Sequence, residues 1–357
     1  IILLKRSDAI VLEMTDSDQP PGPAAADGAG HSLVLALPSY GEGNPQAWES
    51  SAGIGGSPGA ADPVPVGPHE NIVINEILAH TAEPMPDFVE LYNHSAVSVD
   101  LSGCWLTDDP DTNKFRIPDG TRLQPGACLA FEEGQLGFGL KGSGEVVYFV
   151  SPDQARVIDA VRFGGQALAT SYGRFPDGAP GFRELAARTP GQTNAPLLIR
   201  EIVINEIMFH PISGEDADQY VELYNRSTNA VAVGGWRFVE GISFTFPAGT
   251  VIEPDSYLVV AKDVSRMMSN YPGLNPSALV GNFSGTLAGG GEHLALARPE
   301  TVIETNAATH AVTTTTWFVG VDEATYQDGG RYSRWADGGG SSLELIDPVS
   351  DHLLACN

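Results

Sequence analysis

The chain has 357 residues and a formal net charge of −26, with 19 Lys and Arg against 45 Asp and Glu. Such a surface repels phosphate backbones and anionic lipids, and no stretch approaches the roughly 18 apolar residues of a membrane span, so we exclude nucleic-acid binding and membrane insertion. The length allows two or three domains. The 41 glycines and 26 prolines predict short strands joined by turns, and therefore an all-β protein.

A repeat divides the chain into modules. Residues 72–77 read Ile-Val-Ile-Asn-Glu-Ile and recur letter for letter at 202–207. Residues 88–93 are matched by 220–225, at nearly the same separation along the chain. Self-similarity at a fixed period is the signature of a repeated structural unit. We therefore expect two modules of the same kind in series.

Residues 1–66 are predicted to be the C-terminal part of a truncated module plus a linker. Residues 26–38 resemble residues 336–348 near the other end of the chain, and Gly56-Ser57-Pro58-Gly59 resembles Arg188-Thr189-Pro190-Gly191. The Pro/Gly-rich stretches at 57–68 and 189–197 are predicted linkers. We expect the chain to be a fragment of a longer array.

Residues 67–197 are predicted to form the first complete module. Short β-branched or aromatic runs alternate with turn residues, and about seven strands at this spacing are typical of an immunoglobulin-like sandwich. The predicted strands span residues 72–78, 87–92, 103–107, 127–132, 145–151 and 156–163.

Residues 198–357 are predicted to form the second module, with a C-terminal extension and a truncated end. The sustained period of a helix is missing, although residues 264–271 could form one or two helical turns. Trp236 and its counterpart Cys104 fall where a sandwich core takes a large buried residue.

These motifs carry a family resemblance. Ile-Asn-Glu-Ile at 74–77, Phe-Val-Glu-Leu-Tyr-Asn at 88–93 and Leu-Ser-Gly-Cys-Trp-Leu at 101–106 are similar to bacterial lamin-tail domains, as is the close of the first module, Thr189-Pro190-Gly191. The second module resembles the subtype found in large secreted bacterial proteins that also carry a CotH-type kinase-like domain. The resemblance implies tandem immunoglobulin-like sandwiches in an exported protein and implies no catalytic site. Cys104 departs from it, because the family usually has tryptophan there.

The strongest candidate site is a set of acidic residues that recurs in both modules. If the strand of Glu76 lies beside that of Glu90, their carboxylates face each other, with Asp87 close by. Opposed like charges require a cation or hydrogen-bond donors, and Ca²⁺ takes such oxygen ligands. Alternatively, the glutamates bond backbone amides or arginine while Asn75 and Asn93 cap turns. The candidate Ca²⁺ ligands are Glu76, Asp87, Glu90, Glu206, Asp218 and Glu222.

Cys104 and Cys128 form a second candidate pair. They align with Trp236 and Tyr257, positions expected in the sandwich core. A buried disulfide suits an exported module. Two free thiols acting as small apolar side chains are the alternative.

Two classes of function are compatible with these features. The first is a non-catalytic structural or adhesive array of an extracellular or cell-surface bacterial protein, which associates with itself or with other surface proteins into a filament or surface layer. The alternative is a carbohydrate- or Ca²⁺-binding accessory module of a larger secreted protein. Since the sequence has no P-loop, dinucleotide fingerprint or Gly-x-Ser-x-Gly elbow, we expect no enzyme activity and no cofactor other than Ca²⁺.

Overall fold

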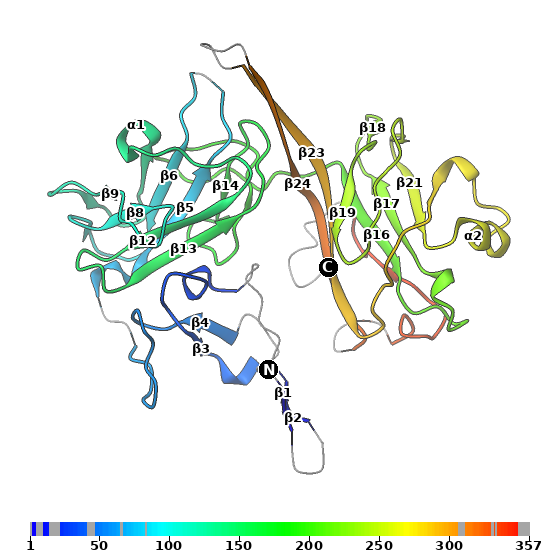
Figure 1. Cartoon of the computed structure of the whole chain (residues 1–357), viewed down its shortest axis with the longest axis horizontal. Coiled ribbons are helices and arrows are strands. Elements are labelled where there is room, and N and C mark those ends of the chain that lie inside the picture. Colours follow the sequence, from blue (N-terminus) through cyan, green and yellow to red (C-terminus); the bar gives the residue numbers. More distant parts are fainter. Residues whose placement is uncertain are drawn as a thin grey trace. The chain divides into compact units, whose positions relative to one another are not determined.

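The computed structural model describes residues 2–4, 10–13, 22–40, 47–64, 67–82, 84–305, 311–329, 332 and 334–348. The chain divides into two units, residues 1–198 and 199–357 (Figure 1). The sequence predicts a module boundary after residue 197. Strands dominate both units, and the α-helices of the described residues are α1 (Glu133–Leu136) and α2 (Val264–Asn270). The all-β prediction is confirmed, and α2 forms where the sequence predicts a helical turn.

The first unit is a β-sandwich with a further N-terminal segment. A five-stranded sheet of order β11-β6-β5-β14-β15 packs on a four-stranded sheet of order β13-β12-β8-β9, and β7 pairs with β10. The N-terminal segment carries the hairpins β1–β2 and β3–β4. The strands are β1 (Ile2–Leu4), β2 (Ile10–Glu13), β3 (Leu33–Leu35), β4 (Trp48–Ser50), β5 (Ile72–Leu78), β6 (Phe88–Asn93), β7 (Val99–Asp100), β8 (Trp105–Thr107), β9 (Phe115–Arg116), β10 (Arg122–Leu123), β11 (Cys128–Glu132), β12 (Glu145–Val150), β13 (Val157–Phe163), β14 (Tyr172–Gly173) and β15 (Arg183–Glu184), with 3-10 helices η1 (Ala24–Ala26), η2 (Pro38–Tyr40) and η4 (Pro68–Asn71).

The alternation of side chains along β5 and β6 builds the core of this sandwich. Val89 and Leu91 are fully buried against Leu106 and Phe149 of the opposite sheet. Since successive residues of a strand point to opposite faces, Glu90 and Tyr92 lie on the outer face. Cys104 is also fully buried in this core, as the sequence predicts.

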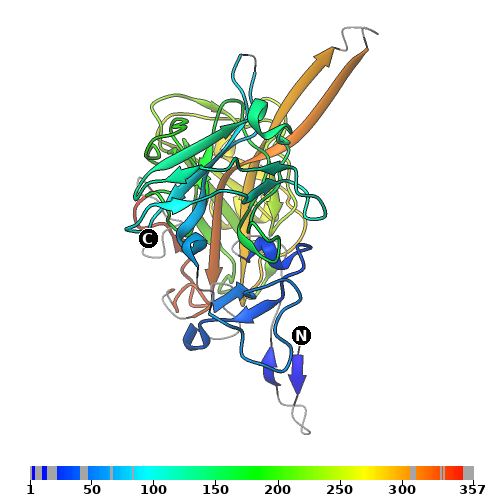
Figure 2. The same cartoon turned by 90° about the vertical axis from the view of Figure 1, so that its left-hand side faces the viewer.

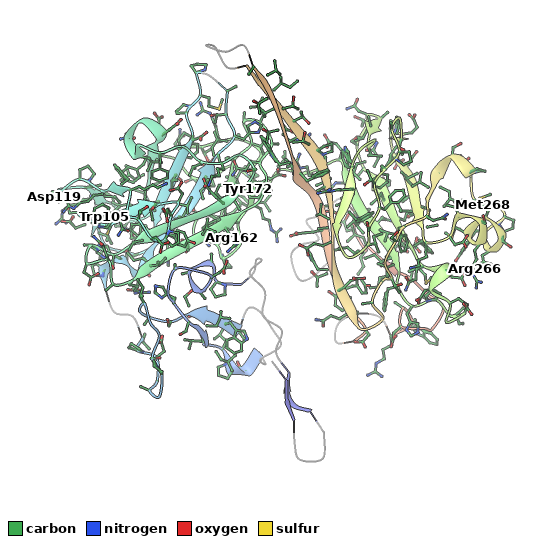
Figure 3. All side chains as sticks on the ribbon, in the orientation of Figure 1. Trp105, Asp119, Arg162, Tyr172, Arg266 and Met268 are labelled. Carbon is green, nitrogen blue, oxygen red and sulfur yellow. The ribbon has the colours of Figure 1, made fainter. Side chains whose placement is uncertain are left out.

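Residues 22–64 pack onto the four-stranded sheet of the first unit. Ala25 and Ala29 contact Tyr148 and Val157 in a small apolar cluster. The buried His31 ring links the N-terminal segment to the sandwich. Its Nδ1 donates to the Ser51 carbonyl at 2.7 Å, and its Nε2 accepts from the Val157 amide of β13 at 3.0 Å. Arg162 on β13, labelled in Figure 3, forms an ion pair with Asp27. The segment is thus part of the first unit.

The second unit repeats the sandwich. Its five-stranded sheet has the order β22-β21-β17-β16-β25, its three-stranded sheet has the order β19-β23-β24, and β18 pairs with β20. The strands are β16 (Ile202–Met208), β17 (Tyr220–Asn225), β18 (Val231–Ala232), β19 (Arg237–Glu240), β20 (Val251–Ile252), β21 (Ser256–Ala261), β22 (Leu279–Gly281), β23 (Gly291–Thr305), β24 (Val312–Gln327) and β25 (Leu343–Glu344), with 3-10 helices η5 (Asp216–Asp218) and η6 (Pro276–Ala278).

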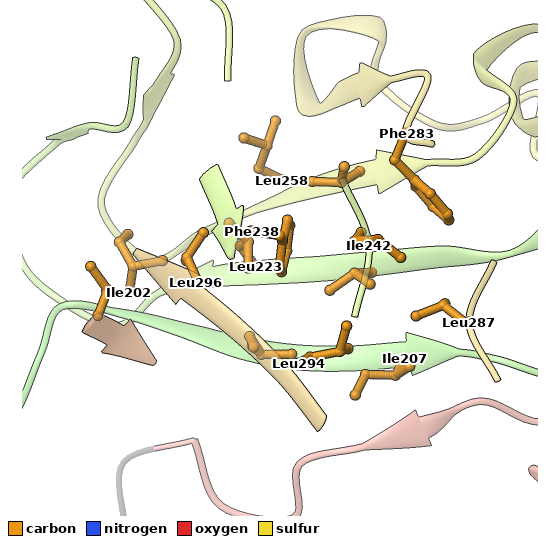
Figure 4. Close-up of a cluster of buried hydrophobic side chains, with 14 of the residues drawn as sticks. Ile202, Ile207, Leu223, Phe238, Ile242, Leu258, Phe283, Leu287, Leu294 and Leu296 are labelled. Carbon is orange, nitrogen blue, oxygen red and sulfur yellow. The ribbon is translucent and has the colours of Figure 1, made fainter. Parts of the chain in front are cut away.

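The core of the second unit lies between these two sheets. Figure 4 shows Leu223 and Leu258 of the larger sheet facing Phe238, Leu294 and Leu296 of the smaller one. All of these side chains are buried, whereas Trp236, predicted at a core position, is half-buried and packs against the cluster edge. Burial of such side chains contributes about 1.5–3 kcal/mol each.

The hairpin of β23 and β24 is much longer than its neighbours. β19 pairs with β23 only at residues 295–297, so residues 298–305 and 312–319 pair with each other alone among the described strands. Figure 2 shows this outer ribbon extending past the sandwich of its unit. Ile303 and Val312 near its tip are 67% and 63% exposed. The ribbon therefore adds little to the core.

Candidate functional site: a glutamate pair under a Thr-Pro-Gly turn

Strands β5 and β6 place Glu76 directly opposite Glu90. A bulge between Ile74 and Glu76 takes Asn75 out of register, and Ile74 and Ile77 therefore both face the core. The bulge leaves the side chains of Asn75, Glu76 and Glu90 together on the outer face of the sheet. All three residues are 0% exposed. Something must therefore cover this outer face.

The cover is a turn at residues 189–192, which follows β15. The Thr189 amide donates to both oxygens of Glu76, at 3.0 and 3.1 Å, and its Oγ1 donates to Oε2 at 2.9 Å. The Gly191 amide donates to Glu90 Oε2 at 2.6 Å, and Asn75 Nδ2 donates to Oε1 at 3.2 Å. Hydrogen bonds to an ionised acceptor are about twice as strong as neutral ones. The turn therefore supplies the donors that two opposed carboxylates require.

The ion pair of Arg174 with Asp159 and the side-chain amide of Asn194 fix the bulge beneath this turn. Asp159 of β13 accepts from the Ile74 amide at 2.8 Å and from Arg174 Nη2 at 3.1 Å, while Arg174 Nε donates to the Ile74 carbonyl at 2.7 Å. Asn194 Nδ2 donates to the carbonyls of Asn75 and Arg174, at 3.0 and 2.8 Å. The segment 171–194, which includes β14 and β15, thus closes the module over β5, and we call it the closing segment.

Burial alters the acidity of both glutamates. It raises the pKa of Glu76, against hydrogen bonds from Ser171 and Thr189. It also raises the pKa of Glu90 to about 7, with a further increase from the charge of Glu76 that the Gly191 amide and Asn75 partly offset. Glu90 therefore changes charge near neutral pH.

The second module repeats the pair with a different set of donors. A bulge between Ile204 and Glu206 again brings Glu206 opposite Glu222. Asn205 Nδ2 donates to Glu222 Oε1 at 3.0 Å, and Glu206 Oε1 accepts from Tyr220 at 2.6 Å and from the Ser342 hydroxyl. Burial raises the pKa of Glu222 to about 7, helped by the charges of Glu206 and Glu344.

Both copies of this arrangement lie within matches to one family model, described as the Lamin Tail Domain, over residues 65–165 and 199–329. Together these regions make up more than half of the chain. The chain belongs to the lamin tail domain family. The two matches confirm a tandem of lamin tail modules with an immunoglobulin-like fold.

Other comparisons add little to this assignment. The crystal structure of a DUF4876 family protein from Bacteroides thetaiotaomicron VPI-5482 shares 9% identity over 72% of this chain and 78% of that one, with a TM-score of 0.25. No curated protein matches the chain. Among the described residues, none of the helices has the length and apolar character to cross a membrane.

The lamin tail modules bring together four of the six predicted Ca²⁺ ligands, as the pairs Glu76–Glu90 and Glu206–Glu222. Asp87 lies elsewhere, where its Oδ1 accepts from Thr81 at 2.8 Å and its Oδ2 accepts from the Leu140 amide at 3.1 Å. The counterpart of Asp87 is Gln219, which receives the Leu287 amide in the same way at 3.0 Å.

The sequence comparison pairs Asp218 with Asp87, but Asp218 lies one position before Gln219, the counterpart of Asp87 in the structure. It pairs instead with Arg266 of α2, labelled in Figure 3, at 2.5 Å from Nε to Oδ1. The Arg266 guanidinium lowers the pKa of Asp218 to about 2.

The contacts of the glutamates fit amide donors better than a cation. In the described part of the chain, His, Cys, Asp and Glu side chains do not converge in groups of three that could hold a metal ion. The oxygens of Glu76 and Glu90 accept from N–H and O–H groups. Asn93 caps a turn, donating to Val97 and Leu123 carbonyls at 2.8 and 3.0 Å, whereas Asn75 serves the glutamate network.

The predicted disulfide is not present, because Cys104 and Cys128 are free thiols, the first in the core between the sheets and the second on the outer face of the five-stranded sheet. Cys104 is buried in the core. Cys128 stands opposite Tyr92 in the β11–β6 register and lies 3.8 Å from Asn75 Nδ2, on the outer face with Glu90. The alignment of Cys128 with a core position is wrong, and its counterpart Tyr257 is 48% exposed on the outer face of the second module.

We expect both thiols to resist alkylation in the folded protein. Burial raises the pKa of Cys104 to about 12 and also raises the pKa of Cys128, and only the thiolate reacts rapidly. At pH 8, iodoacetamide should modify the peptides of Cys104 and Cys128 at least tenfold more slowly in native than in urea-unfolded protein, a rough figure from the thiolate dependence. Peptide mass spectrometry measures both rates, and equal rates would contradict the burial.

Sequence reasoning missed the residues that cover the glutamates. Thr189, Gly191 and Asn194 fall in a stretch predicted to be a linker, yet Asn194 is 4% exposed and all three bond the β5–β6 strands or their bulge. The repetition of the Pro-Gly motif at residues 56–59 could have indicated a structural role for residues 188–191, because the sequence of an unstructured linker is not expected to recur in each module.

Gly173 of β14 gives a direct test of how closely the closing segment fits. A Cβ there would come within 2.6 Å of Leu185, 2.8 Å of Asn194 Nδ2 and 2.9 Å of the Asn75 carbonyl. We expect Gly173→Ala to lower the free energy of unfolding of the first unit by about 1–3 kcal/mol, as overpacking does. Gly164→Ala, whose Cβ meets nothing within 4 Å, is the matched control for urea denaturation. Equal effects of the two variants would refute the close fit.

Proposed function

We propose that this chain is a non-catalytic structural array of an extracellular or cell-surface bacterial protein, whose lamin tail modules space and assemble that protein into a filament or surface layer. The observation that carries the proposal is that the recurring glutamate carboxylates accept hydrogen bonds from their own module. Glu76 and Glu90 are fully buried and bonded by the turn that holds Thr189 and Gly191, so they close a module rather than face a substrate.

The size of one surface hollow supports the same view. One hollow of about 50 Å³ lies between the N-terminal segment and β12, where Ala29 and Ile54 meet Tyr148 and Val150. Small-molecule sites usually measure roughly 300–1,000 Å³. That hollow has room for water but not for a sugar or a nucleotide.

Location is the first test of this proposal. Antibodies against the chain should label intact cells of the source bacterium, and external protease should remove the label. Labelling that requires cell lysis would overturn the extracellular assignment.

Assembly is the second test. Light scattering and negative-stain microscopy, with and without Ca²⁺, should show end-to-end oligomers or filaments. A monomer at every protein concentration would overturn assembly by this chain alone, and a Ca²⁺-dependent oligomer would favour the metal-binding role.

A glycan-binding accessory module is the second candidate. Tyr224 and Tyr257 stack on the outer face of the second module, with ring centroids 4.7 Å apart, and Tyr257 is 48% exposed. Exposed aromatic rings can bind the apolar faces of sugars. Binding of the wild type but not of Tyr257→Ala to a glycan array would support this candidate.

A further inference from the structure

The N-terminal segment has the fold of a closing segment. In the first module, β14 pairs with β15 so that Gly173 lies opposite Arg183. In the N-terminal segment, β3 pairs with β4 so that Val34 lies opposite Glu49. The serine before each first strand also matches, since Ser32 precedes β3 as Ser171 precedes β14.

The turn that covers the glutamates is repeated as well. Its closing hydrogen bond runs from Gln192 N to Thr189 O at 3.0 Å in the first module and from Ala60 N to Ser57 O at 3.1 Å in the N-terminal segment. The glycines at the third position have φ of 76° and 80°, a conformation that side chains disfavour. Both turns are therefore the same structure, at equivalent positions of the repeat.

A side-chain bond within the turn is also shared. Thr189 Oγ1 donates to Asn194 Oδ1 at 3.3 Å, and Ser57 Oγ donates to Asp62 Oδ1 at 2.9 Å. Asp62 differs in one respect, because it cannot donate as Asn194 does. Its Oδ2 accepts instead from the Ala52 amide at 2.8 Å.

The strands that this closing segment would cover are missing from its described surroundings. β14 and β25 each pair with a glutamate-bearing strand, whereas β3 pairs with β4 alone among the described strands. Ser171 is fully buried, but its counterpart Ser32 is exposed, and Leu33 of β3 is 39% exposed. An open strand edge with exposed apolar side chains is a template for pairing with another chain.

We propose that β3 and the turn at residues 57–60 bind the opening hairpin of a further lamin tail module, a pair of strands of the Ile-Asn-Glu-Ile and Val-Glu-Leu-Tyr-Asn type. β3 adds to the edge of the first strand, as β14 adds to β5. The Ser57 and Gly59 amides then bond the paired glutamates, as Thr189 and Gly191 bond Glu76 and Glu90. This inference rests on the proposed structural function and names the partner through which the array would continue.

Among the described residues, the contacts of the segment with its own unit leave this edge free. Attachment runs through His31, Asp27 and Ile54, whose amide donates to the Ala155 carbonyl at 3.3 Å. These residues lie outside β3, and the hairpin with β4 uses the other edge of that strand. An added hairpin therefore requires no rearrangement of the first unit.

The test uses a synthetic peptide of residues 71–94, which contains β5 and β6, and the whole chain as its receptor. We expect saturable binding by fluorescence anisotropy. Ser57→Asp should weaken binding about tenfold by opposing peptide Glu76 with a like charge. Ala186→Asp, an exposed site in the first module, is the control for the added charge.

A charge exchange makes the contact specific. The peptide with Glu76→Lys should bind the wild-type chain weakly and the Ser57→Asp chain more tightly, because the two changes compensate only when the residues touch. Additive effects of the two changes, or binding that ignores Ser57→Asp, would overturn the assignment.

A fusion guards against a peptide that does not form a hairpin alone. Residues 71–94 are placed ahead of Ile1 through a Gly/Ser linker, and hydrogen exchange is measured by mass spectrometry. Exchange of peptides covering 33–35 and 57–60 should slow at least tenfold relative to the unfused chain, as newly bonded amides do. Unchanged exchange together with no peptide binding would overturn the proposal, while surface labelling of cells would remain a separate result.

Discussion

Arg174→Met should lower the free energy of unfolding of the first unit by about 3–5 kcal/mol, the usual effect of removing one partner of a buried ion pair. The Arg174 side chain is 10% exposed and bonds Asp159 as well as the carbonyls of Ile74 and Ala179. Its loss leaves the Asp159 carboxylate short of a partner beside the bulge. Differential scanning calorimetry of the whole chain should show the transition of the first unit moving down while that of the second stays in place.

The double variant Arg174→Met/Asp159→Asn separates the ion pair from the packing. Asparagine keeps an oxygen for the Ile74 amide but carries no charge, so the double variant should lose less stability than Arg174→Met alone. Arg116→Met, whose side chain is 49% exposed in a surface ion pair, is the control and should cost less than about 1 kcal/mol. A loss below about 1 kcal/mol for Arg174→Met would refute the proposed closure.

Much of the fold could be predicted because local patterns decide it. The alternation in Phe88–Asn93, repeated in Tyr220–Asn225, is sufficient to put Glu90 and Glu222 on the outer face of a sheet. The repeat of Ile-Asn-Glu-Ile then supplies the partner strand. The opposition of Glu76 and Glu90 also requires the bulge at Asn75, which moves Glu76 to the outer face and which strict alternation along the strand does not predict.

The cover of the glutamates could not be predicted in the same way. Thr189 and Gly191 meet Glu76 and Glu90 across 113 and 101 residues of chain, and local sequence carries no information on such pairing. A Thr-Pro-Gly turn reads as a linker when taken alone. Its role depends on backbone amides. Because every residue except proline has a backbone amide, the identity of a residue does not indicate that its amide binds a carboxylate.

Two errors have simple physical origins. Alignment with the aromatic residue Tyr257 predicts that Cys128 lies in the core. Leu129 and Phe131 of the same strand face the core, and because side chains of a strand alternate between its two faces, Cys128 points outward. Asp87 directly precedes the first residue of β6, whereas Asp218 lies two positions before the first residue of β17. The two residues therefore differ by one position relative to the start of their strands. A shift of one residue reverses the face of a strand, so such a match cannot hold.

The stability of the first unit should fall as the pH rises from about 4.5 to about 7. Glu90 has an ordinary pKa of 4.5 when exposed and about 7 in the folded protein, so the folded state binds more protons than the unfolded state in this window. The contribution of Glu90 is complete below pH 4.5 and is lost as the pH passes 7. Its size is on the order of 3 kcal/mol. Glu222 acts in the same direction in the second unit.

Glu90→Gln isolates this effect from that of His31. Burial lowers the pKa of His31 below 6.5, so that group opposes Glu90 by adding stability as the pH rises towards 6.5, above which its contribution is complete. Melting temperatures of the wild type and Glu90→Gln, measured every half pH unit from 4.5 to 8, should differ in slope rather than in level alone. The variant should lose the share of the fall that Glu90 contributes, because glutamine has no proton to release, whereas Glu76, whose pKa burial also raises, keeps its own share. Parallel curves would show that Glu90 keeps an ordinary pKa, and that the Gly191 amide and Asn75 compensate fully for its burial beside Glu76.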